Sequence, residues 1–305
     1  MVFSTTLNQM LMFFSVMILG FILIRTKVVP ENADVSLSKV LTNVINPALI
    51  LKTFASNFNI STLIDKSQIF LWGIGLLFIL IFLGTALGNM FADNRYRKYL
   101  YTYSFIIPNM GYMAQPLTLA VFGEEALFNL MIFSIPFNVY IYSVGSTRMN
   151  PQNDKVSLKS LANPLFFSMG VGMVLGLLKA PIPTFVSNTL SSVSGCMGVI
   201  AMLLSGVVIG KYDLRELISS GRVYLASFLR LIVIPGVFVY TLRYIGVPSY
   251  IYMTVLCVLA MPMGLNTVVF PAAYGGDTKP GASMALVSNI FGVITIPIMF
   301  MLFMA

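Results

Sequence analysis

Histidine is absent from the 305-residue chain, and cysteine occurs only twice. Without histidine, the chain lacks both the commonest metal ligand of proteins and the commonest general base. Cys196 and Cys257 both lie inside apolar segments, and two such residues do not form a disulfide framework. We therefore expect buried, unpaired cysteines, no metal site, no cofactor and no disulfide-stabilised secreted fold.

Charged residues are also scarce. They make up 9% of the chain, whereas hydrophobic residues make up 58%. An average soluble domain carries about 25% charged residues. The composition therefore excludes soluble fold classes and predicts an all-α polytopic membrane protein, with the lipid bilayer as its surroundings.

The net charge of +8 does not indicate a nucleic-acid partner, because the basic residues are scattered in short loops between apolar segments. The first apolar segment has no basic residue before it and is followed by Arg25 and Lys27. It also lacks a cleavage site of small residues. We interpret it as an uncleaved membrane span rather than a signal peptide.

Ten segments are apolar enough to be candidate spans, each of which needs about 20 residues. Asn43, Asn46 and Pro47 make the second of them the weakest. The predicted spans are 5–25, 36–55, 69–92, 99–122, 126–148, 161–179, 185–210, 221–245, 250–274 and 281–304.

The distribution of lysine and arginine predicts the orientation. With the N-terminus outside, thirteen of the 18 basic residues fall on the inner side and four on the outer side, and Arg230 is the one left over. Inner loops of membrane proteins are enriched in these residues. We therefore predict a multi-pass protein of the cell membrane with both termini outside.

A polar stretch at about 146–164 separates five predicted spans from five. It predicts a first repeat at 1–148, a cytoplasmic linker at 149–160 and a second repeat at 161–305. An odd number of spans in each half places the second repeat upside down relative to the first. Inverted repeats are typical of secondary transporters.

The fourth and ninth spans support this repeat, because each carries two prolines and ends on an aromatic residue followed by glycine. The paired features are Pro108 and Pro262, Pro116 and Pro271, and Phe122-Gly123 and Tyr274-Gly275. Proline removes a backbone donor and disrupts a helix. Freed backbone groups persist inside a membrane only where protein or a water-lined cavity satisfies them.

We expect the two interrupted helices to cross near the centre of the protein and to bind an anion there. Helix N-termini carry partial positive charge and free N–H groups, and asparagine adds neutral donors. The predicted substrate-binding residues are Pro108, Asn109, Met110, Gly111, Pro262, Met263, Gly264 and Asn266. The competing interpretation is that the prolines only kink their helices.

Coupling to a proton is not expected, because all ten acidic residues fall in loops or at span ends and proton relays use acids within the membrane. This leaves uniport, or a Na⁺ ion held by neutral oxygens. Candidate ion-coupling residues are Gln115, Asn266, Thr267, Ser288 and Asn289, each of which can instead form a helix–helix hydrogen bond. Arg230 is expected to reach the inner face.

The motif PNMGYMAQPLTLAVFG at 108–123 resembles a crossover helix of the auxin efflux carrier family. AMPMGLNTVVFPAAYGGD at 260–277 is similar to the second crossover helix of that family, and NPALI at 46–50 resembles its second span. The resemblance covers essentially the whole chain. Because the long central loop of plant members is absent, the chain is closer to the short bacterial malonate or malate carriers.

The resemblance implies two inverted five-helix repeats with crossed broken helices, as in sodium/proton antiporter-like and bile-acid symporter-like folds. It implies a scaffold of spans 1, 2, 6 and 7, a transport domain of spans 3–5 and 8–10, and a homodimer. It also implies that Asn109 binds a carboxylate and that Pro108 and Pro262 mark the crossing.

The sequence therefore favours a secondary transporter of a small organic anion, such as malonate, malate or an auxin-like acid, working by alternating access. The alternatives are an anion channel-like pore and a membrane receptor or sensor derived from a transporter. An enzyme is not expected, since neither a histidine nor an acid within the membrane is present.

Overall fold

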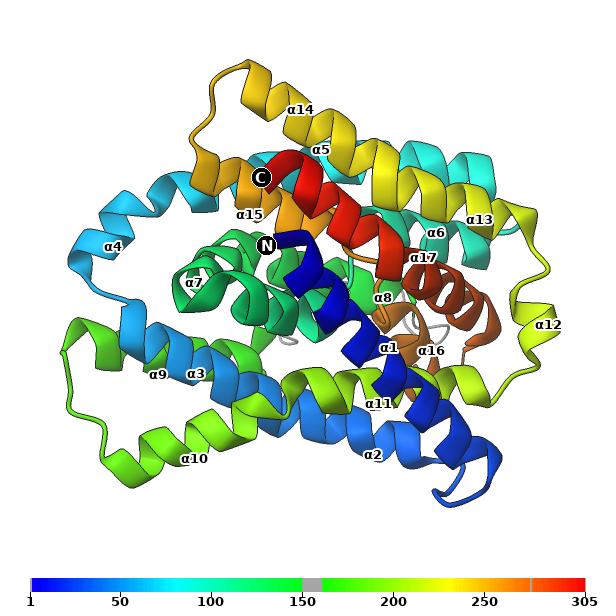
Figure 1. Cartoon of the computed structure of the whole chain (residues 1–305), viewed down its shortest axis with the longest axis horizontal. Helices are drawn as coiled ribbons and strands as arrows, with labels where there is room; N and C mark the ends of the chain where they lie inside the picture. The colour runs from blue at the N-terminus through cyan, green and yellow to red at the C-terminus, as the bar shows by residue number, and fades with distance from the viewer. Residues whose placement is uncertain (1, 150–160, 275, 305) are drawn as a thin grey trace.

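The computed structural model describes residues 2–149, 161–274 and 276–304, so most of the predicted linker at 149–160 lies outside the described residues. All regular elements in these ranges are helical (Figure 1). In the first half they are α1 (Val2–Arg25), α2 (Ala33–Val40), η1 (Leu41–Ile45), α3 (Asn46–Asn57), α4 (Ile60–Asp65), α5 (Ser67–Phe91), α6 (Arg95–Ile106), η2 (Met110–Ala114), α7 (Gln115–Tyr140), η3 (Ile141–Gly145) and α8 (Ser146–Arg148), where η marks a π-helical turn.

The second half repeats the pattern of long apolar helices. Its elements are α9 (Pro164–Leu177), α10 (Thr184–Gly195), α11 (Met197–Gly210), α12 (Leu214–Leu217), α13 (Gly221–Phe228), η5 (Leu229–Val233), α14 (Ile234–Tyr244), α15 (Ser249–Leu259), α16 (Asn266–Tyr274) and α17 (Lys279–Met304). Several predicted spans therefore consist of two or three shorter helical pieces in sequence.

Within the described ranges, six helical runs are long and apolar enough to cross a membrane, which shows a multi-pass membrane protein. They are Val2–Arg25, Ile60–Phe91, Met110–Gly145, Thr184–Gly210, Gly221–Tyr244 and Lys279–Met304. Of the other predicted spans, the second has polar residues at its centre, the sixth is short, and the fourth and ninth are interrupted. By helix length and composition alone, the structure supports six of the ten.

The boundary between the fourth and fifth predicted spans falls inside α7. The chain bends there at Gly123, whose φ of 83° and ψ of −173° are not helical. A positive φ of this kind strongly favours glycine. Gly123 therefore marks a kink between two helical parts of α7, where the sequence predicts a turn between two spans.

Glycines allow the long helices to approach closely. A Cβ atom on Gly206 of α11 would collide with the backbone carbonyl oxygen of Met17 in α1, and one on Gly176 of α9 would collide with that of Phe58, just after α3. A Cβ atom on Gly88 of α5 would collide with the side-chain hydroxyl of Thr102 in α6. Small residues at helix contacts let membrane helices approach closely in this way.

Some helix contacts of the two halves have counterparts in the other half. The first helix, α1, packs along α11, and α9 of the second half packs along α3 (Figure 1). Likewise α5 contacts α7 in the first half, and α13 contacts α17 in the second. Exchanging the first five predicted spans with the last five converts each contact into its counterpart.

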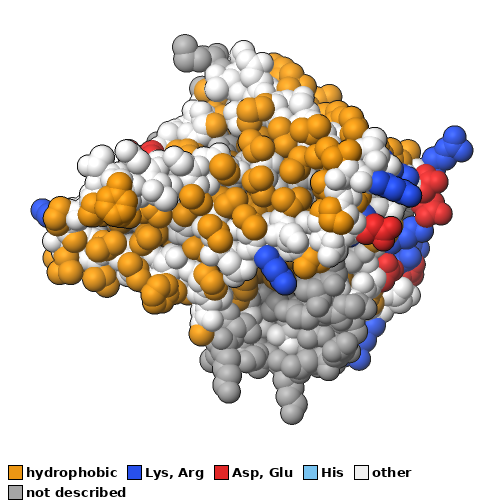
Figure 2. Space-filling view, turned by 90° about the horizontal axis from the view of Figure 1, so that it is seen from below, with side chains coloured by type: hydrophobic (Ala, Val, Ile, Leu, Met, Phe, Trp, Pro, Cys, Tyr) orange, Lys and Arg blue, Asp and Glu red, His pale blue; other side chains and the backbone are white. Residues whose placement is uncertain are grey.

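The surface is largely apolar. In Figure 2, hydrophobic side chains cover much of the face shown, and most of the charged side chains gather toward one edge. Large side chains such as Phe82 (81% exposed) and Phe167 (74% exposed) project outward. Aromatic residues this exposed fit a protein surrounded by lipid rather than by water.

The expectation that Arg230 reaches the inner face is wrong. Arg230, in η5, is 0% exposed, and none of its three guanidinium nitrogens has a hydrogen-bond partner among the described residues. The sequence spacing between Arg222 and Arg230 gives their separation along the helix. It does not reveal that α17 packs against η5 and covers this part of the helix. The side chain is therefore enclosed by protein instead of extending to water.

Candidate functional site

Two helix interruptions carry the predicted site. The first separates α6, which ends at Ile106, from η2, which begins at Met110. The second separates α15, which ends at Leu259, from α16, which begins at Asn266. Pro108 and Pro262 lie within these interruptions, as expected from the missing proline donor. The helices therefore stop where the sequence predicts.

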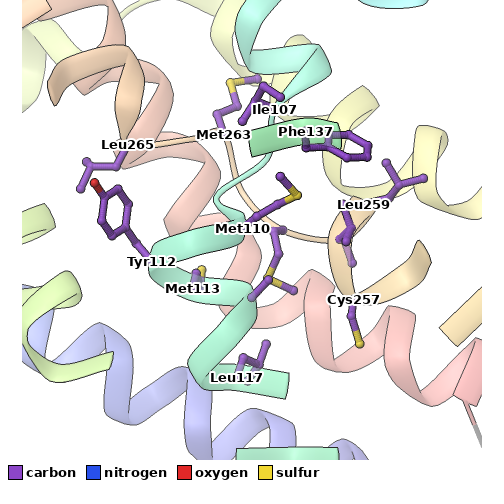
Figure 3. Packing of buried hydrophobic residues seen from close by; sticks show 14 of the residues in the cluster. Ile107, Met110, Tyr112, Met113, Leu117, Phe137, Cys257, Leu259, Met263 and Leu265 are labelled. Atoms are coloured by element: carbon purple, nitrogen blue, oxygen red, sulfur yellow. The ribbon is translucent and has the colours of Figure 1, made fainter. Parts of the chain in front are cut away.

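The two interruptions pair with each other. Pro108 and Met263 form an isolated antiparallel bridge, and the backbone nitrogen of Asn109 donates to the carbonyl oxygen of Pro262 over 2.9 Å. Figure 3 shows Ile107 and Met263 next to each other at this point. Residues more than 150 positions apart thus form backbone hydrogen bonds with each other. Inside a membrane protein, backbone polar groups need such partners because lipid offers none.

Several backbone donors beside this pairing have no recorded acceptor. In the described part of the chain, no hydrogen bond is recorded from the N–H groups of Gly111 and Tyr112 in the first half. The same holds for Gly264, Leu265 and Asn266 in the second half. These groups lie at the N-terminal ends of the resumed helices, where the helix dipole is positive. Both halves therefore present free amide donors in one region.

These donors belong to residues that line a cavity of about 40 Å³. Of the predicted substrate-binding residues, the ones that line it are Pro108, Asn109, Met110, Gly111, Gly264 and Asn266. Gln115, predicted as an ion-coupling residue, also lines it. A water molecule needs about 10–15 Å³ on this measure, so the cavity has room for a few waters and no larger guest.

Side-chain amides in this cavity also have unused hydrogen-bonding atoms. Asn109 is 2% exposed, and neither its Oδ1 nor its Nδ2 has a partner among the described residues. Gln115 Oε1 and Asn46 Oδ1 are likewise buried without partners. Buried polar atoms are nearly always paired, so three unsatisfied amides around one cavity indicate a place for a polar guest.

The other predicted residues do not line the cavity. The hydroxyl of Ser288 accepts from the backbone nitrogen of Met263 over 3.1 Å and donates to Met284 O over 2.6 Å. Thr267 Oγ1 donates to Gly264 O, and Asn289 Nδ2 donates to Ala285 O. These side chains hold the local backbone, and Pro262 takes part through its carbonyl oxygen.

Asn266 has a different partner from the one expected of a substrate ligand. Its Nδ2 donates to the hydroxyl of Tyr103 over 2.9 Å, which leaves its backbone N–H as the group without a recorded acceptor. The Tyr103 ring in turn packs edge-on against Phe270 of α16. Tyr103 thus ties the start of α16 to α6.

Several residues that line the cavity were not predicted from the sequence. They are Asn46, Ile107, Tyr112, Ser134, Asn138, Ile141, Tyr142, Leu165 and Leu265. The Asn46-Pro47 pair inside an apolar segment was a usable signal, because it resembles Pro108-Asn109 in composition. Figure 3 places Tyr112 beside Leu265, so its ring closes one side of the pairing region.

The chemistry of the site is that of neutral donors and acceptors. None of the residues lining the cavity is an Asp, Glu, Lys or Arg. Over the described residues, no group of three His, Cys, Asp or Glu side chains could hold a metal ion. Amide donors without a formal charge can bind an oxyanion at a lower desolvation cost than a buried permanent charge.

Comparison with protein-family models identifies the chain. The model of a family described as membrane transport proteins matches residues 5–157 and again residues 152–300. The comparison with curated proteins gave no match. The two matches together span nearly the whole chain and divide it into two repeats. The chain therefore belongs to the membrane transport protein family, which is the family of the auxin efflux carriers.

Proposed function

We propose that the protein is a secondary transporter that carries a small organic anion, such as malonate, malate or an auxin-like acid, across the cell membrane. The observation that carries this proposal is the cavity at the two paired interruptions, lined by unsatisfied amides and by no acidic residue. A carboxylate accepts several hydrogen bonds at once. It would satisfy Asn109 Nδ2 and the free backbone donors of both halves together.

The proposed architecture is ten spans in two inverted five-helix repeats, 1–148 and 161–305, whose interrupted helices cross. The corresponding contacts of the two halves, α1 with α11 and α9 with α3, support this symmetry. In this arrangement spans 1, 2, 6 and 7 form the scaffold, and the remaining six form the transport domain. Both termini then lie outside, and two copies form a homodimer.

Polar contacts tie the proposed scaffold to the transport domain at both ends. At one end, Lys52 of α3 pairs with Glu124 of α7 over 3.0 Å. At the other end, the hydroxyls of Tyr212 and Thr278 are hydrogen-bonded. With the cavity limited to about 40 Å³, the arrangement corresponds to a closed state. Alternating access would break one set of contacts at a time and widen the cavity for the anion.

Coupling in this proposal is either absent or uses Na⁺. Gln115 Oε1 is a predicted ion-coupling oxygen that lines the cavity and is buried without a partner among the described residues. A Na⁺ ion bound there would be held by neutral oxygens, as hard cations prefer. The proposal assigns no ion-binding role to Ser288, whose hydroxyl is already occupied.

Saturable exchange of a carboxylate is the expected result of a counterflow assay. Purified protein in liposomes preloaded with malonate, malate or indole-3-acetate should accumulate the labelled form of at least one of them, with and without a Na⁺ gradient. Malonamide should not compete, because it is neutral and gains little from oriented amide donors. A dependence on Na⁺ would distinguish symport from uniport.

Empty liposomes are the control for leakage. Linear, non-saturating flux with single-channel currents would contradict the transporter and favour a pore. Binding of the anion without any exchange would contradict it in favour of a receptor.

A further inference from the structure

A second cleft lies apart from the paired interruptions, where α6, α13 and α17 begin. Its volume is about 520 Å³, which is in the usual range of ligand pockets, about 300–1,000 Å³. None of its lining residues lines the cavity at the interruptions. The proposed topology places this cleft at the inner face of the membrane.

The cleft is lined by three cations, Arg97, Arg215 and Lys279, and by two carboxylates, Glu216 and Asp277, so basic side chains outnumber acidic ones by one. Lys279 pairs with Glu216 over 2.6 Å, and Arg97 pairs with Asp93 over 2.7 Å. No carboxylate of the described residues forms an ion pair with Arg215. Exposed ion pairs contribute little, about 0–1 kcal/mol, so an anionic ligand that binds Arg215 can compete with Glu216 for Lys279 and with Asp93 for Arg97.

Backbone donors add to this positive character. At the start of α13, Ser220 forms no side-chain cap, and no hydrogen bond is recorded from the N–H groups of Gly221 and Arg222 in the described chain. Ser219 and Ser220 also line the cleft. A helix N-terminus with free N–H groups favours an anion, and here it stands beside three basic side chains.

The opposite end of α17 provides a comparison. A pocket of about 290 Å³ there is lined by Glu125 and, among the described residues, by no lysine or arginine. Two pockets at the two ends of the same helix thus differ in charge. The excess of basic side chains is therefore found in the first cleft and not in the pocket at the other end of α17.

We propose that the basic cleft binds a phosphate group, either as the headgroup of an acidic phospholipid or as a soluble phosphate. The arginine fork matches the oxygens of a phosphate geometrically, and basic pockets between membrane helices on the cytoplasmic side bind lipid phosphates. A phosphate held between Arg97, Arg215 and Lys279 links α12 to α6 and α17. α12 connects α11 of the proposed scaffold to α13 of the proposed transport domain. A phosphate bound in the cleft would therefore bias the movement of the transport domain against the scaffold.

The test measures binding without transport, so it is independent of the proposed substrate. Purified protein is titrated with inorganic phosphate by calorimetry, and its melting temperature is compared in nanodiscs of phosphatidylcholine alone and of phosphatidylcholine with phosphatidylglycerol. Arg215→Gln should weaken the response about tenfold, the effect of losing one charge-assisted hydrogen bond. Arg243→Gln is the matched control, since it removes one arginine near the end of α14, outside the cleft.

A response to inorganic phosphate that Arg215→Gln weakens supports the site with a soluble ligand. A response only to phosphatidylglycerol, weakened in the same variant, supports it with a lipid headgroup. No response to either, or equal losses in Arg215→Gln and Arg243→Gln, would overturn the proposal and show a general effect of charge.

Discussion

Replacing Asn109 with alanine should weaken binding of the transported anion about 10- to 100-fold, because a hydrogen bond to a charged group contributes about 1.5–3 kcal/mol. The melting temperature should stay close to that of the unchanged protein. Both polar atoms of this side chain lack partners among the described residues, so the substitution breaks no hydrogen bond of the unliganded protein. Binding is measured by calorimetry, and folding by thermal denaturation in the same detergent.

Asn129→Ala is the matched control for this experiment. Asn129 is also buried, at 5% exposure, and its Oδ1 also lacks a partner in the described chain. It lines the pocket at the opposite end of α17 instead of the cavity. Its substitution should leave the affinity unchanged. Equal affinity of the Asn109 variant and the unchanged protein would show that Asn109 does not contact the substrate.

Replacing Arg230 with methionine should raise the free energy of unfolding by about 1–4 kcal/mol, the gain seen when buried charges are replaced by apolar residues of similar volume. Arg230 is fully enclosed, and its guanidinium has no acceptor among the described residues. Chemical denaturation of the purified protein measures the change.

Two further variants separate charge from packing. Arg230→Lys keeps a buried cation, so it should bring no gain in stability. Arg222→Met removes a cation whose side chain is 59% exposed, and it should change the stability by no more than about 0.5 kcal/mol. A loss of stability in Arg230→Met would contradict the interpretation and would mean that the guanidinium forms hydrogen bonds in the folded protein.

Most helix positions were predictable from the sequence because they depend on apolar segment length and on proline. The breaks after Ile106 and Leu259 occur just before Pro108 and Pro262, where a backbone donor is missing. The kink at Gly123 was predictable as the boundary between the fourth and fifth spans. Glycine can adopt the required φ of 83°, and the residue stands directly after the aromatic residue that ends the fourth predicted span.

The composition of the site was harder to predict because it depends on which helix faces meet. Asn46 lines the cavity together with residues of both interruptions. The residue spacing within the second predicted span does not show that this span contacts the interruptions. Ser288 was expected near an ion, yet its hydroxyl serves the nitrogen of Met263. Arg230 was expected in water because a sequence does not show which helix covers it.

In the proposed site, amide groups from both halves of the chain hold one carboxylate between them. Solid-state NMR can measure this contact between a ¹³C-carboxylate ligand, chosen by the counterflow assay, and protein labelled with [¹⁵N]glycine. Gly111→Ala removes one label at a position where a Cβ atom meets nothing within 4 Å, and Gly170→Ala does the same at a comparably open position outside the cavity.

We predict dipolar dephasing that corresponds to a carbon–nitrogen separation of about 4 Å, as in an N–H···O hydrogen bond to a carboxylate. The dephasing should decrease in Gly111→Ala without disappearing, because the labelled nitrogen of Gly264 still contacts the carboxylate. It should remain unchanged in Gly170→Ala. A bound ligand whose carboxylate shows no contact with any glycine nitrogen would contradict the account.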